Sequence, residues 1–440
     1  MASSDFDIVI IGGGPAGLSA AIEADRLGAS AVVLEAEDVP GGLTRSFQRD
    51  GYTFDCSGHL LHLADPDAVA MVERATDKSD WNRIERDSVI YMEGEIVPYP
   101  FQLHLAHAPE GVKRECLELL PTEAPAEPAA LDDNFGEWIE ANLGGGIGRH
   151  FMVPYNEKLS TVPVGELTCE WLGRFVPQPS PEEIRRGGER RRTVQTGYNR
   201  SFLYPSHGGI ATLSAGLANL VPDLITGARV TGVDSAERTV QTADGRSFGY
   251  RRAVVATMPL PRLAEIVTPT EEALGLREEL RANVVTCVNL GIRDANPEIS
   301  RYQWIYLPGR ELSSYRVGFY KRFAESMAPA GREGLYVEIA HGPDEEEGAL
   351  VESAIADMVK LGTITGADSV ETVLPVRIEC AYVIHDSRTA PVRTALQKAL
   401  RERDVLVAGR YGHWEYSAME DAMVGGLRIA REALGEPAAA

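Results

Sequence analysis

Hydrophobic residues fill every position from 8 to 11, and this run ends at Gly12. A short continuous apolar run of this kind is typical of a strand buried in a parallel sheet. The alanine-rich segment 18–27 that follows predicts a helix, and the wholly apolar segment 31–34 predicts a second strand. The N-terminal part of the chain is therefore expected to form a strand–helix–strand unit.

Apolar and alternating segments recur along the rest of the chain and predict further strands. We expect four of these strands to complete the first sheet, directly or through a hairpin: 228–233, 239–242, 253–256 and 405–409. Those expected to form a second, antiparallel sheet are 302–307, 314–319 and 334–339. Helical patterns occupy, among others, residues 65–87, 351–361 and 419–434.

The order of these elements predicts an α/β protein whose first domain is discontinuous. We expect this domain to be Rossmann-like and to combine residues 1–90, 200–290 and 395–440. Residues 91–199 are expected to form a mainly helical insertion, and residues 291–394 an antiparallel-sheet domain. The basic run 183–192 within the insertion predicts a solvated mobile loop.

Three glycines separate the first predicted strand from the first predicted helix. Gly12, Gly14 and Gly17 have the spacing G-x-G-x-x-G, and Glu35 follows the second strand. This spacing provides a tight turn, a close backbone approach to a pyrophosphate, and close packing of the helix on the strand. The helix N-terminus would face the phosphates, and Glu35 would accept hydrogen bonds from an adenosine ribose. The sequence therefore predicts a bound dinucleotide.

The charge and the cysteine content narrow the class of protein. A net charge of −22 argues against nucleic acid or an anionic membrane as a partner. The five cysteines are scattered and form no C-x-x-C pair, so neither disulfides nor a zinc site is expected. No apolar run approaches the ~20 residues of a membrane helix, and no signal peptide is evident. We expect a soluble cytoplasmic protein without a metal.

A second glycine-rich segment follows the predicted dinucleotide unit. Gly41 and Gly42 precede Leu43 and Arg45, which would suit a close approach to a second anionic part of a cofactor. A plain turn is the alternative interpretation of a glycine pair.

Taken together, these motifs resemble those of the FAD-containing amine oxidase and protoporphyrinogen oxidase superfamily. Within it the chain resembles the UDP-galactopyranose mutases, particularly the eukaryotic type. The segments that carry this resemblance are VPYPFQ (97–102), PYNEKLSTVP (154–163), TCEWLGRFVP (168–177), QWIYLP (303–308), SYRV (314–317) and GRYGHWEY (409–416).

The resemblance implies an FAD-binding domain of the GR2 type together with a substrate domain. It also implies a redox-neutral reaction of a UDP- or TDP-hexose. In that family the N5 atom of reduced FAD attacks the anomeric carbon and expels the nucleoside diphosphate, and the sugar ring opens and recloses at another hydroxyl. An external reductant such as NAD(P)H would then be needed to reduce the flavin.

The resemblance also assigns roles to individual residues. His59 matches the histidine beside the flavin, and Arg174 and Arg316 match two arginines that clamp the diphosphate. Residues implied to bind FAD, besides those named above, are Gly58, Val230, Gly409, Arg410 and Met419. Residues implied to bind the substrate are Tyr99, Gln102, Asn156, Trp304, Tyr306, Tyr382, Tyr416 and Glu420.

Three positions depart from the family pattern. Ser57 replaces a glycine, Ser160 replaces a tryptophan, and Glu420 replaces an asparagine. A carboxylate close to a diphosphate is repulsive by about 1 kcal/mol at 4 Å even in water. Either Glu420 points away from the substrate, or the chain uses a different sugar nucleotide or another substrate.

Without the resemblance, ordinary structural roles would account for several of these residues. Arg316 would be a surface charge, and Trp304 a core aromatic residue. Two other functions stay open: an FAD-dependent oxidase or desaturase of the amine oxidase type, and a flavin-binding protein without catalysis.

Overall fold

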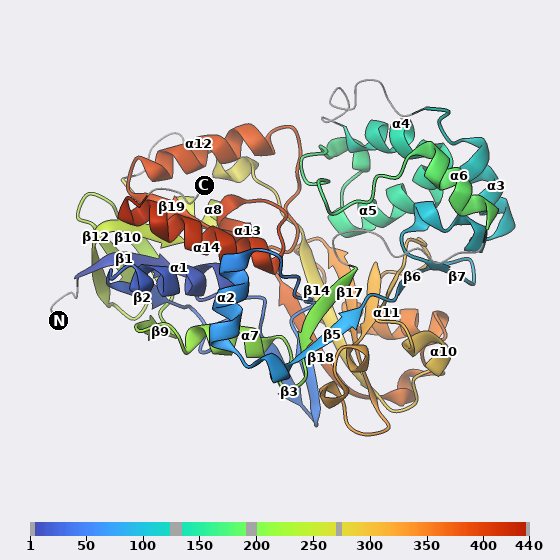
Figure 1. Ribbon diagram of the computed structural model, residues 1–440, viewed down its shortest axis with the longest axis horizontal. Helices are drawn as coiled ribbons and strands as arrows, with labels where there is room; N and C mark the ends of the chain where they lie inside the picture. The colour runs from blue at the N-terminus through green and yellow to red at the C-terminus, as the bar shows by residue number, and fades with distance from the viewer. Residues whose placement is uncertain (1–4, 124–133, 191–199, 270–274, 437–440) are drawn as a thin grey trace.

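The computed structural model describes residues 5–123, 134–190, 200–269 and 275–436 (Figure 1). It contains two large sheets and a separate group of helices, so the predicted α/β class is confirmed. Figure 1 shows the first sheet and its helices on the left, the helical group at the upper right, and the second sheet below that group.

The first sheet has eight strands in the order β13-β10-β11-β12-β1-β2-β9, with β19 paired to β12. Its strands are β1 (Asp5–Ile11), β2 (Ala31–Leu34), β9 (Leu224–Ile225), β10 (Val230–Asp234), β11 (Thr239–Thr242), β12 (Ser247–Ala256), β13 (Val267–Thr268) and β19 (Val405–Val407). β1 pairs in parallel with β2 and β12, and β12 pairs in parallel with β19. The predicted strands at both ends of the chain and in its middle therefore meet in one sheet.

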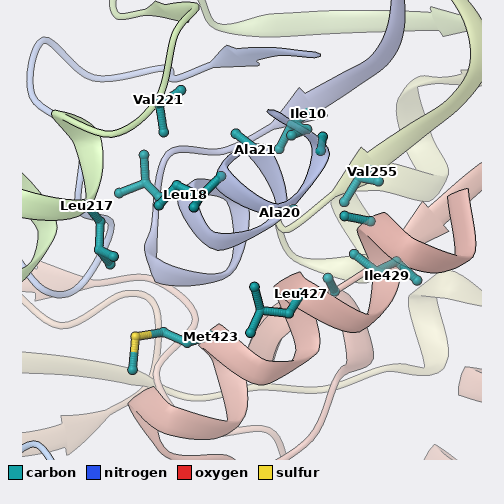
Figure 2. Close-up of a cluster of buried hydrophobic side chains, with 14 of the residues drawn as sticks. Ile10, Leu18, Ala20, Ala21, Leu217, Val221, Val255, Met423, Leu427 and Ile429 are labelled. Atoms are coloured by element: carbon teal, nitrogen blue, oxygen red, sulfur yellow. The ribbon is translucent and has the colours of Figure 1, made fainter. Parts of the chain in front are cut away.

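Helices α1 (Pro15–Arg26) and α14 (Met419–Leu434) pack together beside this sheet. Leu18 and Leu427 belong to the same buried cluster as Ile10 of β1 (Figure 2). A Cβ atom at Gly426 would lie 2.1 Å from the carbonyl oxygen of Ala16, so this close approach of the two helices requires glycine. Further helices around this sheet are α2 (Pro66–Ala75), α7 (Ala211–Ala218), α8 (Leu260–Ile266), α12 (Thr389–Arg401) and α13 (Gly409–His413).

The second sheet has seven strands in the order β18-β14-β17-β16-β15-β6-β7. They are β6 (Ser88–Met92), β7 (Glu95–Pro98), β14 (Val284–Ile292), β15 (Trp304–Tyr306), β16 (Arg316–Phe319), β17 (Glu333–His341) and β18 (Val370–Ile378). The three strands predicted over residues 302–339 are confirmed as antiparallel neighbours. β14 joins this second sheet, although it begins within the range 200–290 assigned to the first domain. Helices α10 (Pro297–Ser300) and α11 (Glu347–Lys360) complete this part.

The helical group contains α3 (Glu110–Glu118), α4 (Phe135–Ile147), α5 (Val153–Ser160) and α6 (Pro181–Glu189). Phe101, Phe135, Trp138 and Phe151 belong to its buried cluster. The predicted mobile loop is wrong for residues 183–189, because Ser180 and Glu183 form a capping box that starts α6. The end of that basic run lies outside the described residues.

One predicted helix is partly wrong. Residues 66–75 form α2, but β5 (Trp81–Glu85) follows and pairs with β8 (Ser201–Pro205). This partner is more than a hundred residues away in the sequence, so local periodicity did not reveal it. β3 (Ser46–Arg49) and β4 (Tyr52–Asp55) form a further hairpin. Among the described residues, no helix combines the length and the apolar character needed to cross a membrane.

Candidate active site

A cavity of about 850 Å³ lies at the carboxyl ends of the parallel strands. Its lining includes Gly12 after β1, Glu35 after β2, Thr257 after β12 and Gly409 after β19. This edge is where open α/β sheets bind their ligands. The cavity extends from there to β15, β16 and β17 of the second sheet, so both sheets contribute to one site.

Glycine backbone forms the walls at the sheet end of this cavity. Gly12, Gly42 and Gly409 all have positive φ angles, of 101°, 55° and 74°. A Cβ atom at Gly14 would lie 3.9 Å from the Cα atom of Gly42, so two backbone segments lie close together here. Together with the N-terminus of α1, these segments form a cradle that fits a pyrophosphate.

The carboxylate of Glu35 is held by two backbone donors. Gly13 N–H donates to Oε2 at 2.6 Å, and Glu37 N–H donates to Oε1 at 2.9 Å. A carboxylate has about four acceptor positions, so both oxygens retain capacity for ribose hydroxyls. The side chain is thus fixed in place at the end of β2 and still able to bind an adenosine.

Two buried polar groups that line the cavity have no hydrogen-bond partner among the described residues. They are Arg410 Nε and the Ser417 hydroxyl. Buried polar groups in native proteins are rarely unpaired. Their gathering around one cavity fits a large polar ligand.

Most of the residues predicted to bind a cofactor line this cavity. They are Gly12, Gly14, Glu35, Gly42, Leu43, Arg45, Gly58, Val230, Gly409, Arg410 and Met419. Gly17 lies outside the lining, where a Cβ atom would come within 1.9 Å of the carbonyl oxygen of Gly12. Its lack of a side chain lets α1 begin close to the turn after β1.

His59 lines the cavity from the loop after β4. Its Nδ1 lies 3.1 Å from the carbonyl oxygen of Ser57. Burial lowers the pKa of His59 to about 4, because the charged imidazolium would lose its hydration. The imidazole is therefore neutral at physiological pH.

Arg316 extends from β16 and is fixed by a buried carboxylate. Its Nε and Nη2 donate to Glu338 of β17 at 2.5 and 2.9 Å, and Glu338 is fully buried. Ser57 also donates its hydroxyl to Glu338, at 2.5 Å. The pKa of Glu338 is lowered by the neighbouring guanidinium despite the opposing effect of burial. The departure at Ser57 therefore belongs to the network that holds Arg316.

A second, smaller pocket of about 160 Å³ adjoins the cavity on the side of the helical group. Tyr99, Phe175, Tyr306, Arg316 and Tyr416 line both spaces. The pocket brings together the predicted substrate residues Tyr99, Gln102, Asn156, Tyr306, Tyr382 and Tyr416. Trp304 lines the large cavity instead.

Arg410 lies against two of these tyrosines. Its guanidinium carbon is 4.7 Å from the ring centre of Tyr416 and 5.2 Å from that of Tyr382. The two rings are nearly parallel, with an angle of 15° and centres 6.0 Å apart. A cation of the protein itself thus lies against both rings.

Besides Gly17, two predicted site residues line neither space, Arg174 and Glu420. Arg174 is half-exposed and forms an ion pair of 2.6 Å with Asp421 in the first turn of α14. Glu420 points away from the cavity, because its carboxylate accepts the N–H groups of Ala64 and Asp65 at the start of α2. The expectation that Glu420 contacts the substrate is therefore corrected: its carboxylate caps the start of α2 instead. Arg174 is adjacent to Phe175, which lines both spaces.

Glu338 and His385 are among the residues of the site that were not predicted from the sequence. Glu338 is the single charged residue in the apolar segment 335–340, and this pattern could have revealed it. His385 lines the small pocket from the segment after β18. Nothing in the local pattern distinguishes it from an ordinary loop histidine.

Comparisons with known proteins agree with this architecture. The chain is 29% identical over 143 residues to a chloroplastic prolycopene isomerase of Daucus carota, which covers 31% of the chain and 21% of the relative. It is 23% identical over 283 residues to a probable flavin-containing monoamine oxidase A of Dictyostelium discoideum, which covers 58% of each. These matches span less than two thirds of either relative.

Among solved structures, the chain is similar to reduced UDP-galactopyranose mutase. The TM-score is 0.90 at 25% sequence identity, with 98% of this chain and 94% of the other covered. The family of flavin containing amine oxidoreductases matches residues 15–434, nearly the whole chain. The glycine cradle and Glu35 fit the dinucleotide part of FAD. The protein therefore belongs to the flavin containing amine oxidoreductase family, and its cofactor is FAD.

Proposed function

We propose that this protein is an FAD-dependent sugar-nucleotide mutase that interconverts the pyranose and furanose forms of a UDP- or TDP-hexose. The observation that carries this proposal is the junction of the two spaces at Arg316, Tyr306 and Tyr416. A flavin cavity that opens past an arginine into an aromatic pocket suits a substrate whose diphosphate separates its sugar from its nucleoside. The similarity to reduced UDP-galactopyranose mutase supports the same function.

FAD, when bound and reduced, supplies an electron-rich nucleophile for the sugar carbon. The chain has to bind and orient the substrate and to stabilise the charge of the departing diphosphate. Arg316 suits this task because a guanidinium stays protonated and has five N–H donors. Two of its N–H groups donate to Glu338, which fixes the orientation of the guanidinium. The remaining N–H groups are therefore oriented before a ligand binds.

The remaining residues would position the two ends of the substrate. Tyr99, Gln102 and Asn156 line the small pocket, where a pyrimidine nucleoside would bind. His59 is neutral and would offer the flavin side of the cavity a hydrogen bond without adding a charge. An external reductant such as NAD(P)H would keep the flavin reduced.

The alternative is an FAD-dependent oxidase or desaturase of the amine oxidase type, which the match to the Dictyostelium relative favours. Two parallel tyrosine rings would suit a cationic amine. In this chain, however, Arg410 lies against both Tyr382 and Tyr416. Arg410 would repel a second cation placed beside these rings, so a cationic amine fits this site less well.

Anaerobic turnover separates the two functions. The purified protein is reduced with dithionite and incubated with UDP- and TDP-hexoses in both ring forms, and the products are separated by chromatography. We expect interconversion with the reduced protein and none with the oxidised protein. Stoichiometric hydrogen peroxide from an amine in air, with no interconversion, would support the oxidase instead.

A further inference from the structure

The small pocket contains a buried histidine to which the proposed reaction assigns no role. His385 is 3% exposed and lines this pocket beside Tyr382. Its carbonyl oxygen accepts the N–H of Thr168 at 2.7 Å, which ties the segment after β18 to the helical group. This hydrogen bond restrains the backbone that carries the imidazole.

One ring nitrogen of His385 faces a carboxylate. Nδ1 lies 3.4 Å from Oε2 of Glu170, and Glu170 also forms an ion pair with Arg393. The neighbouring His385 and Arg393 side chains lower the pKa of Glu170 to about 2. The Glu170 carboxylate carries a negative charge and only accepts hydrogen bonds, so it favours the tautomer of His385 with the proton on Nδ1, the nitrogen that faces it.

The other ring nitrogen, Nε2, is buried, and neither it nor Nδ1 meets the geometry of a hydrogen bond with the described residues. With the proton on Nδ1, Nε2 is an acceptor. Gln102 contributes a second unpaired acceptor to the same pocket, because its amide nitrogen donates to Pro177 and its Oε1 has no partner within the described part of the chain. An unpaired buried acceptor is unfavourable, because it has lost its hydrogen bonds to water. Two of them in one pocket indicate a ligand that brings hydrogen-bond donors.

We propose that His385 is a specificity-determining residue of the small pocket, where its Nε2 accepts a hydrogen bond from a hydroxyl or N–H group of the bound nucleoside. Glu170 is a positioning residue that selects the ring nitrogen facing the ligand. This inference rests on the proposed function for the identity of the ligand. A pyrimidine ribonucleoside carries an imide N–H and two ribose hydroxyls, and a 2′-deoxynucleoside lacks one of these donors.

Calorimetric binding of UDP and 2′-deoxy-UDP to the FAD-loaded protein tests this. We expect His385→Leu to weaken UDP binding about 10- to 100-fold, the loss of one buried hydrogen bond. His385→Gln retains a polar acceptor and should recover part of the affinity. Glu170→Gln should weaken binding less than His385→Leu, because it releases the ring without removing it.

The matched control is His341→Leu. His341 is also buried, but its Nε2 is paired with Thr286 at 2.8 Å and its Nδ1 lies 2.6 Å from the Gly342 carbonyl oxygen. It lines neither space. This variant should lose stability and keep the wild-type UDP affinity.

Each outcome decides a separate point. If His385→Leu removes the difference between UDP and 2′-deoxy-UDP, the donor is the 2′-hydroxyl; if the affinity falls and the difference persists, it is another donor of the nucleoside. Wild-type affinity in folded His385→Leu would overturn this inference alone. If the wild-type protein bound neither nucleotide, the proposed function would fail together with this inference.

Discussion

At the scale of single residues, the site depends on the direction of one guanidinium. Arg316 gives two N–H groups to Glu338 and lies where the two spaces meet. The planar fork of arginine binds a carboxylate and a phosphate at the same time, whereas a lysine is a point charge.

We therefore predict that Arg316→Lys weakens UDP binding by at least about 10-fold although the charge is kept, since a hydrogen bond to a charged group contributes about 1.5–3 kcal/mol. Calorimetry of the FAD-loaded protein measures this. Arg322→Lys is the control, because Arg322 pairs with Glu333 outside the site. Equal UDP affinity in Arg316→Lys and the wild type would argue against a diphosphate at this position.

A buried carboxylate beside the site predicts a pH dependence of stability. Asp55 is fully buried and accepts hydrogen bonds from Ser46, Tyr204 and the N–H of Ile210. Burial raises its pKa to about 6, above the unfolded value of about 3.9. The native state therefore holds an extra proton between these values, and the contribution of Asp55 to stability falls as the pH rises from about 4 to 6.

Asp55→Asn removes this titration. Between pH 5 and pH 7 the free energy of unfolding of the wild type should fall by about 1 kcal/mol relative to the variant, since one pKa unit corresponds to about 1.4 kcal/mol. Urea unfolding at both pH values measures the difference, and only the change with pH is compared. Parallel pH dependence in the two proteins would show that Asp55 titrates normally.

Single residues also show where sequence reasoning succeeded and where it ended. The glycines and Glu35 were predictable because the shape of a dinucleotide requires these residue types, and because all of them lie close together in the sequence. Arg174 and Glu420 were assigned to the substrate by position in a motif, yet each pairs with a group more than 200 residues away. His385 was missed because its partner, Glu170, is likewise remote in the chain.

At the scale of elements, the contact of α1 with α14 supports the cofactor cradle. A Cβ atom at Gly426 would overlap the Ala16 backbone, so the helices would have to separate. We predict that Gly426→Ala lowers the stability by about 1–3 kcal/mol, the usual effect of overpacking, and reduces the FAD retained on purification. The flavin absorbance per protein and the thermal midpoint measure both effects.

Gly348→Ala in α11 is the matched control, since a Cβ atom there would have no neighbour within 4 Å. Alanine is the better helix former, so this variant should be neutral or slightly more stable. If both variants behaved alike, the close approach of α1 and α14 would not matter for the cradle.

Elements with a strong local pattern were predicted well, and those that depend on remote pairing were not. The closing helix was expected over 419–434 and lies there. β5 was expected to be helical, because its pairing with the remote strand β8 is not visible in the local sequence pattern. The start of α6 was recognisable only from its capping box, which a run of arginines obscured.

At the scale of the whole molecule, the two sheets and the helical group enclose one continuous site. The larger cavity has contributions from both sheets, and the smaller pocket lies between the second sheet and the helical group. The class of fold was predictable from the order of its elements. The junction at Arg316 was not, because it depends on how the three parts pack.

In the proposed reaction, the diphosphate leaves the sugar and returns while Arg316 holds it. Positional isotope exchange tests it most directly, with a UDP-hexose carrying ¹⁸O in the bridge between the anomeric carbon and the phosphorus. We predict that the dithionite-reduced protein moves this label into non-bridging positions of the recovered substrate, and that the oxidised protein does not. A label that stays in the bridge while the reduced protein binds the UDP-hexose would show that the diphosphate does not leave the sugar.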